Sequence, residues 1–267
     1  MLKQGDAKHG RFFVPEKDLY VGRSLETYGE WCEREVQLFG QIVKPGATVV
    51  EVGANFGSHT VPLARLVGPE GRVFAIEMQP FVSQVLSANL IANGMYHAQV
   101  VQAGVSDVAQ ELRVPRIKYG AAYNYGGISV EFLEDFAHSK ETQTVQIGPL
   151  DDLLTLTRLD FLKLDVENLE LEALRGAAGL IGLHRPVIYL ENDNPDATDA
   201  VLGFLRGQGY RCYWHRSWLF NANNHAGAAE NVFGNERCIN MLAVPDDRPV
   251  TRLRPAVDGA NHPSLIW

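Results

Sequence analysis

The stretch VVEVGANFGSHT, residues 49–60, decides the fold class. A run of β-branched residues leads into a turn containing Gly53, Asn55 and Gly57, and an amphipathic segment follows at residues 58–67. A strand, a glycine-rich turn and a helix in this order form the repeating unit of parallel sheets with crossover helices. In such sheets ligands bind beyond the carboxyl ends of the strands, where glycine lets the backbone approach a ligand closely. The stretch therefore predicts a parallel sheet and, at this turn, a ligand site.

The same alternation continues along the chain. Its periodicity predicts strands at residues 48–54, 72–77, 98–105, 160–166 and 186–191, and helices at 58–67, 80–93, 169–181 and 196–208. Two further strands, at 210–215 and 238–244, have no helical pattern between them and should pair as an antiparallel hairpin. We therefore predict an α/β fold with a seven-stranded, mostly parallel sheet, an antiparallel last strand and helices on both faces.

Three regions are expected around this sheet. Residues 1–44 should form a helical extension or lid, residues 45–250 the main domain, and residues 251–267 a C-terminal tail. Two insertions, 107–150 and 216–237, are rich in Gly, Asn, Tyr and His. Long loops inside a compact domain usually carry function, so both insertions are interpreted as facing a substrate.

The composition of the chain limits which kinds of partner, metal site and membrane contact are expected. The chain has 267 residues, with 24 basic against 32 acidic side chains and a formal charge of -8, which argues against a nucleic-acid partner. Cys32, Cys212 and Cys238 are odd in number and widely spaced, so neither a disulfide framework nor a zinc site is expected. With no apolar leader and no spanning segment, we expect a cytoplasmic protein without a membrane partner.

A cofactor is predicted at the ends of the first three strands. Glu77 ends the second strand about twenty residues after the glycine turn, a spacing at which a carboxylate can bind both ribose hydroxyls. Met78 follows as an apolar neighbour suited to an adenine face. Ser106 and Asp107 end the third strand, where a polar side chain could reach the adenine amine. A solvated glutamate and a simple turn are the alternative interpretations.

The choice of cofactor depends on the missing glycines. The turn has the pattern G-x-N-x-G and lacks the second and third glycines of G-x-G-x-x-G, which let a pyrophosphate lie against a helix N-terminus. S-adenosylmethionine (SAM) has no phosphate and tolerates this turn. A nicotinamide dinucleotide would use the same geometry, so a dehydrogenase stays as a weaker alternative.

From residue 20 to 244 the chain resembles the FkbM family of methyltransferases. The resemblance is carried by YVGRSLETYGEW, VVEVGANFGSHTVPLA, FAIEMQP, DFLKLDVENLELEALRGA, RPVIYLEND and GYRCYWH. It implies the Rossmann-like class I methyltransferase fold and transfer of a methyl group from SAM to a hydroxyl of a sugar, polysaccharide or polyketide-like metabolite. The candidate SAM-binding residues are Glu51, Gly53, Asn55, Gly57, Glu77, Met78, Ser106, Asp107 and Asp165.

One departure from the family is visible. The family usually has D-V-E-G after the fourth strand, whereas here Asn168 follows Asp165, Val166 and Glu167. Asparagine tolerates the left-handed backbone conformation better than most residues, so the turn can be kept.

Catalytic candidates lie at the ends of strands four and five. Asp165 and Glu191 should meet at one rim beside the cofactor, where a carboxylate can remove the proton of a hydroxyl acceptor. Asp165 could instead cap the next helix, and Glu167 could either contact substrate or stabilise the first helical turn. His59, in the first helical turn after Gly57, could contact SAM or the acceptor, or simply line the site.

Further polar residues are candidates for the site, for its lid or for a structural role. His215 ends the sixth strand and is a further candidate, while Tyr28 and Glu30 are candidate lid residues. We expect the segment around Trp31 and residues 216–237 to close over the cleft. Lys163 lies inside its strand rather than at the end, so it is interpreted as a structural partner of a carboxylate.

A divalent metal is a further hypothesis. Catechol-type methyltransferases resemble this chain in placing an acid at the end of strand four and an acid–amide pair at the end of strand five. Here these positions hold Asp165, Glu191 and Asn192, whose oxygen ligands suit Mg²⁺. Without a metal, Asp165 or Glu191 would act as the base directly. The acceptor is expected to be a small molecule or saccharide, and a SAM-binding or nucleotide-binding module without transfer activity is the main rival.

Overall fold

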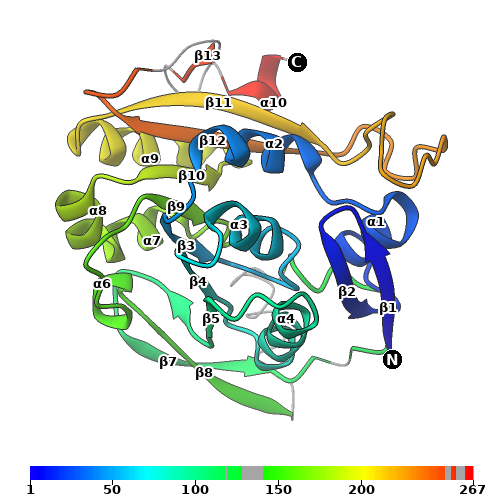
Figure 1. Ribbon diagram of the computed structural model, residues 1–267. Coiled ribbons are helices and arrows are strands. Elements are labelled where there is room, and N and C mark those ends of the chain that lie inside the picture. Colours follow the sequence, from blue (N-terminus) through cyan, green and yellow to red (C-terminus); the bar gives the residue numbers. More distant parts are fainter. Residues whose placement is uncertain (118, 128–140, 250–253, 257–261, 267) are drawn as a thin grey trace.

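The computed structural model describes residues 1–117, 119–127, 141–249, 254–256 and 262–266. Its main sheet matches the predicted seven strands, extended at one edge by a two-residue strand, β13 (Figure 1). Neighbouring strands from β5 to β10 are parallel, and β12 runs antiparallel to both β10 and β11. From one edge to the other, the strands are β5 (Ala98–Val101), β4 (Arg72–Ile76), β3 (Thr48–Val52), β9 (Phe161–Leu164), β10 (Val187–Glu191), β12 (Arg237–Pro245), β11 (Tyr210–Trp218) and β13 (Arg254–Pro255).

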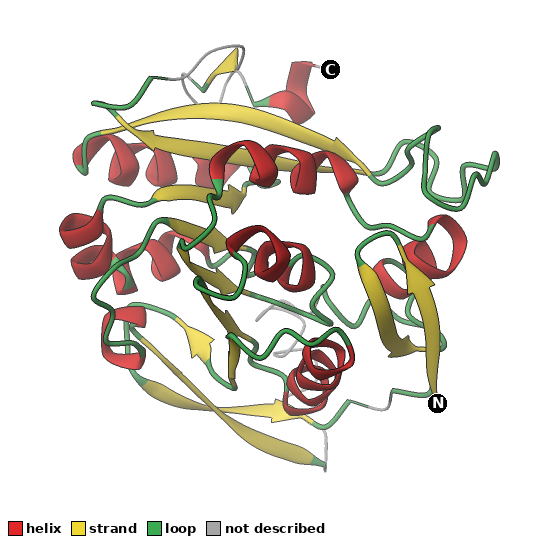
Figure 2. Ribbon diagram, in the orientation of Figure 1, coloured by secondary structure: helices red, strands yellow, loops and turns green. Residues whose placement is uncertain are grey.

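Alternate residues of the strands face two separate cores. Val49 and Phe161 pack with one set of helices, whereas Val50 and Leu162 pack with the other, as the two-residue period of a strand requires. Figure 2 shows helices on both faces of the sheet. One set consists of α2 (Glu33–Ile42), α3 (Thr60–Val67) and α4 (Pro80–Ala92), and the other of α7 (Glu170–Gly176), α8 (Ala178–His184) and α9 (Pro195–Gly207).

Helix boundaries follow the predictions with one break. The helix predicted at residues 169–181 is divided at Ala177 into α7 and α8. The left-handed Arg185 ends α8, and Asn194 caps α9 by accepting a hydrogen bond from the Asp196 backbone N–H. These helices cover the strands that end in the candidate catalytic residues.

The N-terminal extension is only partly helical. It begins with a β-hairpin of β1 (Leu2–Ala7) and β2 (Gly10–Pro15), which the sequence analysis did not predict, and continues with α1 (Val21–Tyr28) and α2. Buried Asn89 of α4 holds the hairpin: its side chain accepts from the Phe13 N–H at 2.6 Å and donates to the Phe13 carbonyl at 2.9 Å. The extension is therefore anchored to the main domain.

The first insertion builds a second sheet. The strand predicted at residues 98–105 ends at Val101, and Gly104 and Val105 form β6, which pairs with β8 (Thr142–Gly148). β7 (Gln110–Pro115) pairs with β8 from the other side, and α6 (Leu150–Leu153) follows. Residues 118 and 128–140 of this insertion lie outside the described part of the chain.

The predicted tail is described only in two short pieces. These contain β13 and α10 (Pro263–Ile266), while residues 250–253, 257–261 and 267 lie outside the described residues. Among the helices that the structure describes, none has both the length and the apolar character needed to cross a bilayer.

Candidate functional site

A cavity of about 320 Å³ opens beyond the carboxyl ends of β3, β4, β9 and β10. Its wall also includes residues of the N-terminal extension, among them Tyr20 and Trp31, and of the region from Leu219 to Asn240. Most of the predicted site residues line it, namely Glu51, Gly53, Asn55, His59, Glu77, Met78, Asp165, Glu167 and Glu191. The predicted residues Gly57, Ser106, Asp107 and Asn192 are not part of its wall.

The glycine turn is shaped by close packing as well as by space for a ligand. Gly53 has a φ of +77°, and a Cβ there would overlap the carbonyl oxygen of Asp165, so β3 and β9 can approach only without a side chain. Gly57 has a φ of +86°, and a Cβ there would lie 2.7 Å from a methyl group of Leu86. Gly57 therefore allows helix packing, while Gly53 presents bare backbone to the cavity.

Glu77 holds this turn from the end of β4. One carboxylate oxygen accepts the backbone N–H of Asn55 at 3.0 Å, and the other accepts that of Gln79 at 2.8 Å. Burial raises the pKa of Glu77 to about 7, against these two hydrogen bonds. Each carboxylate oxygen can accept a second hydrogen bond, so a ribose diol can bind here without displacing the backbone.

Three carboxylates meet across the cavity from Glu77. Asp165, Glu167 and Glu191 each bring one oxygen within 4.8 Å of the others. Burial, followed by repulsion from Asp165, raises the pKa of Glu167 to about 8 and raises that of Glu191 well above its ordinary value. Burial thus favours the protonated forms of Glu167 and Glu191, and a nearby positive charge would favour their ionised forms.

Lys163 supplies the buried cation beside this cluster. Its ammonium donates to Asp165 at 2.8 Å and lies 3.7 Å from a carboxylate oxygen of Glu51, its cross-strand neighbour. Glu51 also accepts a hydrogen bond of 2.6 Å from the Thr60 hydroxyl, and burial raises its pKa to about 7. The structure confirms that Lys163 is a structural partner of carboxylates.

The turn after β9 has two left-handed residues. Glu167 has a φ of +53° and Asn168 a φ of +74°, a region that L residues rarely adopt. Asn168 thus adopts the conformation expected of the family's glycine. This backbone brings the Glu167 carboxylate toward Asp165, and the Glu170 carboxylate accepts the Val166 N–H at 3.2 Å.

Several predicted residues lie elsewhere. The side-chain oxygen of Asn192 accepts the Thr198 hydroxyl at 3.2 Å, so the structure places Glu167, rather than Asn192, with Asp165 and Glu191. His215 pairs with the Tyr189 hydroxyl at 2.8 Å and does not reach the cavity wall. Ser106 and Asp107 follow β6 of the small sheet, since the third predicted strand is broken before them.

Sequence reasoning missed Glu35 of α2, a buried wall residue. One of its carboxylate oxygens accepts from the Asn240 amide at 3.0 Å, and the other lies 3.8 Å from Nε2 of His59. Burial raises the pKa of Glu35 to about 8 and lowers that of His59. A signal was available: Glu35 stands four residues before the buried Phe39, on the same face of its helix.

The two predicted lid segments contact one another. The Tyr28 hydroxyl donates to the carbonyl of Glu230 at 2.9 Å. The Glu30 carboxylate accepts from the Asn221 amide at 2.7 Å and from the His225 backbone N–H at 3.0 Å. In Figure 1 the loop between β11 and β12 lies beside α1. These three hydrogen bonds therefore join the end of α1 and the residues after it to this loop.

Comparison with known proteins decides the family. The sequence matches the FkbM methyltransferase domain over residues 51–212, more than half of the chain. The chain belongs to this family. The match begins in β3 and ends in β11, so it covers the carboxyl ends of β3, β4, β9 and β10 at the cavity. The matched family is described as a methyltransferase domain.

Individual relatives are more distant. The antimetabolite synthetase AmbE of Pseudomonas aeruginosa is 27% identical over 212 residues, covering 64% of this chain and 10% of AmbE. A protein-L-isoaspartate O-methyltransferase of Aeropyrum pernix is 37% identical over 83 residues, covering 30% of this chain and 31% of that enzyme. The structure of an FkbM methyltransferase from Methylobacillus flagellatus has a TM-score of 0.47 and 16% identity, covering 78% of this chain and 50% of that chain. The chain thus spans at most about a third of these two curated relatives.

Proposed function

We propose that this domain transfers the methyl group of SAM to a hydroxyl oxygen of a small-molecule or saccharide acceptor. The observation that carries the proposal is the group of Asp165, Glu167 and Glu191 in the same cavity as the glycine turn and Glu77. A hydroxyl needs a group that removes its proton during methyl transfer, and a carboxylate in a buried setting is a suitable base.

The cofactor fits the first half of the cavity. Glu77 is positioned for the ribose, Met78 for the adenine, and the bare backbone at Gly53 for the amino-acid portion, which suits the lack of phosphate-binding glycines. SAM carries one net positive charge through its sulfonium. In a cavity lined by five or more carboxyl groups this charge favours their ionised forms. Binding of SAM therefore prepares the bases for the reaction.

The reaction then needs alignment and one proton transfer. The acceptor oxygen forms a bond to the methyl carbon while the carbon–sulfur bond breaks, leaving S-adenosylhomocysteine. The hydroxyl proton passes to Glu191 or Glu167, whose raised pKa makes the ionised carboxylate a stronger base. The Lys163 ammonium donates a hydrogen bond of 2.8 Å to Asp165 and so holds this carboxylate in place beside them.

A magnesium ion is an alternative for the same three carboxylates. Their oxygens are close enough to share one ion, and oxygen ligands are those that Mg²⁺ prefers, although Lys163 already occupies one oxygen of Asp165. Bound there, the ion would lower the pKa of the acceptor hydroxyl. Loss of turnover in chelator and recovery with magnesium alone would support the ion. Full turnover in excess chelator would leave the carboxylates as the base.

The charge of the site guides the choice of acceptor. The chain carries a formal charge of -8, and the cavity wall holds more acidic than basic side chains, so a polyphosphate backbone would meet repulsion. A neutral polyhydroxyl acceptor meets none, and neighbouring carboxylates can each accept a hydrogen bond from one of its hydroxyls. We therefore favour a saccharide or small polyol-like metabolite over RNA.

Labelled SAM tests the proposal directly. The protein is incubated with labelled SAM and separate fractions of glycans, small metabolites and RNA, and the product is characterised by mass. A methyl ether on a saccharide or metabolite is the expected result. Label in RNA or on nitrogen would overturn it, and SAM binding with no transfer to any fraction would support the binding-module rival.

A pair of variants then assigns the base. Glu191→Gln should lower turnover by about 100-fold, within the range for loss of a general base, while SAM binding is retained. Glu170→Gln is the matched control, because Glu170 is also buried with a pKa raised to about 7 but lies outside the cavity wall. If Glu191→Gln turns over as fast as Glu170→Gln, Glu191 is not the base.

A further inference from the structure

Two of the three cysteines meet although they are far apart in the sequence. Cys32 stands immediately before α2 with a left-handed φ of +41°, and Cys238 is the second residue of β12. Their sulfur atoms are 3.6 Å apart, and both thiols are free. The third cysteine, Cys212, is buried in the core on the other face of the sheet. The sequence spacing, from which neither a disulfide framework nor a zinc site was expected, gave no sign of this contact.

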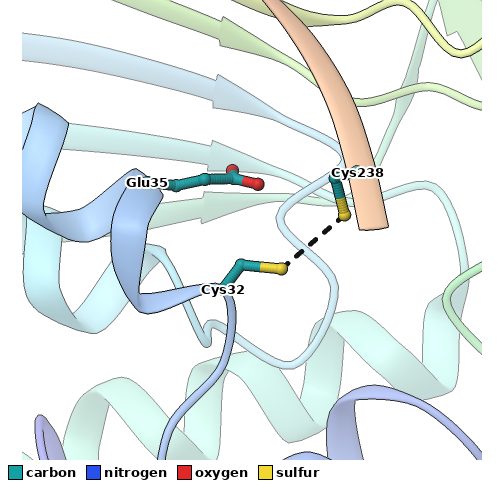
Figure 3. Close-up of side chains that lie close together, drawn as sticks. All are labelled: Cys32, Glu35 and Cys238. Atoms are coloured by element: carbon teal, nitrogen blue, oxygen red, sulfur yellow. Dashed lines mark hydrogen bonds between the residues drawn. The ribbon is translucent and has the colours of Figure 1, made fainter. Parts of the chain in front are cut away.

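Glu35 completes a group with this pair. It lies one helical turn after Cys32, and Figure 3 shows its carboxylate directed toward the space beside Cys238. The two sulfurs and a carboxylate oxygen all lie within 4.8 Å of one another. Cys32 and Glu35 are 1% and 3% exposed, and Glu35 and Cys238 line the cavity, so the group is buried beside the cavity wall.

The geometry suits a tetrahedral metal ion. With zinc–sulfur bonds of about 2.3 Å, two thiolates on one tetrahedral ion lie roughly 3.8 Å apart, close to the observed 3.6 Å. The Asn240 amide fixes the carboxylate of Glu35 at 3.0 Å, as hydrogen bonds to metal ligands commonly do. His59 adds an independent observation: among the described residues its buried Nε2 has no hydrogen-bond partner, and it lies 3.8 Å from Glu35.

We propose that Cys32, Glu35 and Cys238 bind a zinc ion at the wall of the cavity. Two thiolates and a carboxylate are ligands that zinc accepts, and three protein ligands leave a fourth position for water or for a group in the cavity. The site joins the start of α2 to β12, and so ties the N-terminal extension to the sheet beside the cofactor. It is separate from the carboxylate cluster, which contains no sulfur ligand and is suited to a harder ion.

Metal loading of the full chain tests the site without any assay of activity. The protein is reduced, stripped of metal, and titrated with Zn²⁺ and with Co²⁺, whose thiolate charge-transfer absorption reports sulfur ligation. Wild type should take up one zinc with this cobalt signature. Cys32→Ser and Cys238→Ser should lose the signature and bind zinc at least about 100-fold more weakly, beyond the cost of losing an outer hydrogen bond. Cys212→Ser is the matched control and should behave as wild type.

Other outcomes would overturn the proposal. These are no zinc uptake by wild type, a cobalt spectrum without charge transfer, or equal zinc affinity in wild type and in Cys238→Ser. A thiol count distinguishes the zinc site from a pair of cysteines that forms a disulfide. The count is made under denaturing conditions on metal-free protein kept in air. Two missing thiols, with no zinc uptake after reduction, would identify a disulfide instead. Retained SAM binding verifies folding of each variant, and Cys238→Ala replaces Cys32→Ser if that variant does not fold.

Discussion

Replacing Glu77 by glutamine tests the assignment of the cofactor site. The substitution keeps the side-chain shape but turns one acceptor oxygen into an NH₂ group, which then faces the backbone N–H of Asn55 or of Gln79. It also removes a charged acceptor for the ribose hydroxyls. A hydrogen bond to a charged group is worth about 1.5 to 3 kcal/mol, so SAM should bind about 10- to 100-fold more weakly.

Calorimetric titration with SAM measures this loss, and thermal unfolding without ligand verifies that the variant is folded. Glu170→Gln again serves as the control, since Glu170 is buried and bonded to a backbone N–H but is not itself part of the cavity wall. Its SAM affinity should match that of wild type. A folded Glu77→Gln variant with unchanged affinity would refute the ribose assignment, and equal losses in both variants would show only a general effect on the fold.

Three further predictions follow from the charges and contacts of the wall. Because the pKa of Glu77 is raised to about 7 and that of Glu167 to about 8, SAM affinity should rise between pH 6 and 8, with release of protons on binding. Calorimetry in buffers of different ionisation enthalpy measures the affinity and the protons released. An affinity that does not change with pH would show that these groups are uninvolved. The raised pKa of Glu35, about 8 against an ordinary 4.5, contributes stability below pH 4.5 that is lost as the pH rises through 8. The melting temperature of metal-free Glu35→Gln should therefore depend less on pH than that of metal-free wild type. The same dependence of melting temperature on pH in both proteins would contradict a raised pKa at Glu35. Glu30→Ala removes two hydrogen bonds to the loop and should speed hydrogen exchange at residues 216–237 by about tenfold. In wild type, exchange in the same residues should slow when SAM and product are added. No change in either experiment would contradict a lid formed by this segment.

The sheet and the part of the cavity around the glycine turn were predictable because they depend on local patterns. The β-branched runs alternate with helical segments, and Gly53 and Glu77 occupy the fixed positions where strands end in this fold. Asp165 and Glu191 lie close together as predicted, because the neighbouring parallel strands β9 and β10 bring their carboxyl ends to the same edge of the sheet. Periodicity alone therefore located one half of the cavity.

The other half depends on contacts between distant segments. Glu35 reaches the cavity, and Cys32 reaches Cys238, only because the N-terminal extension and α2 fold back over the sheet, which no local pattern encodes. Asn192 was expected at the rim because it follows Glu191, but it lies just beyond the end of β10 and its side chain accepts a hydrogen bond from Thr198 of α9. Ser106 and Asp107 were misplaced because Gly104 starts a strand in a different sheet.

The turn at Asn168 links backbone conformation to Glu167, one of the proposed bases. Asn168 is exposed and has a φ of +74°, so its side chain contributes little packing and substitutions there act mainly through the backbone. Asn168→Gly should be neutral or slightly stabilising, whereas Asn168→Val should cost about 1 to 2 kcal/mol, because a β-branched residue strongly resists the left-handed region. For a chain of this size the loss corresponds to roughly 2 to 8 °C in melting temperature. Since the same turn positions Glu167 beside Asp165, turnover should fall in Asn168→Val and be kept in Asn168→Gly. If both variants melt and turn over alike, the left-handed conformation does not set the position of the carboxylate.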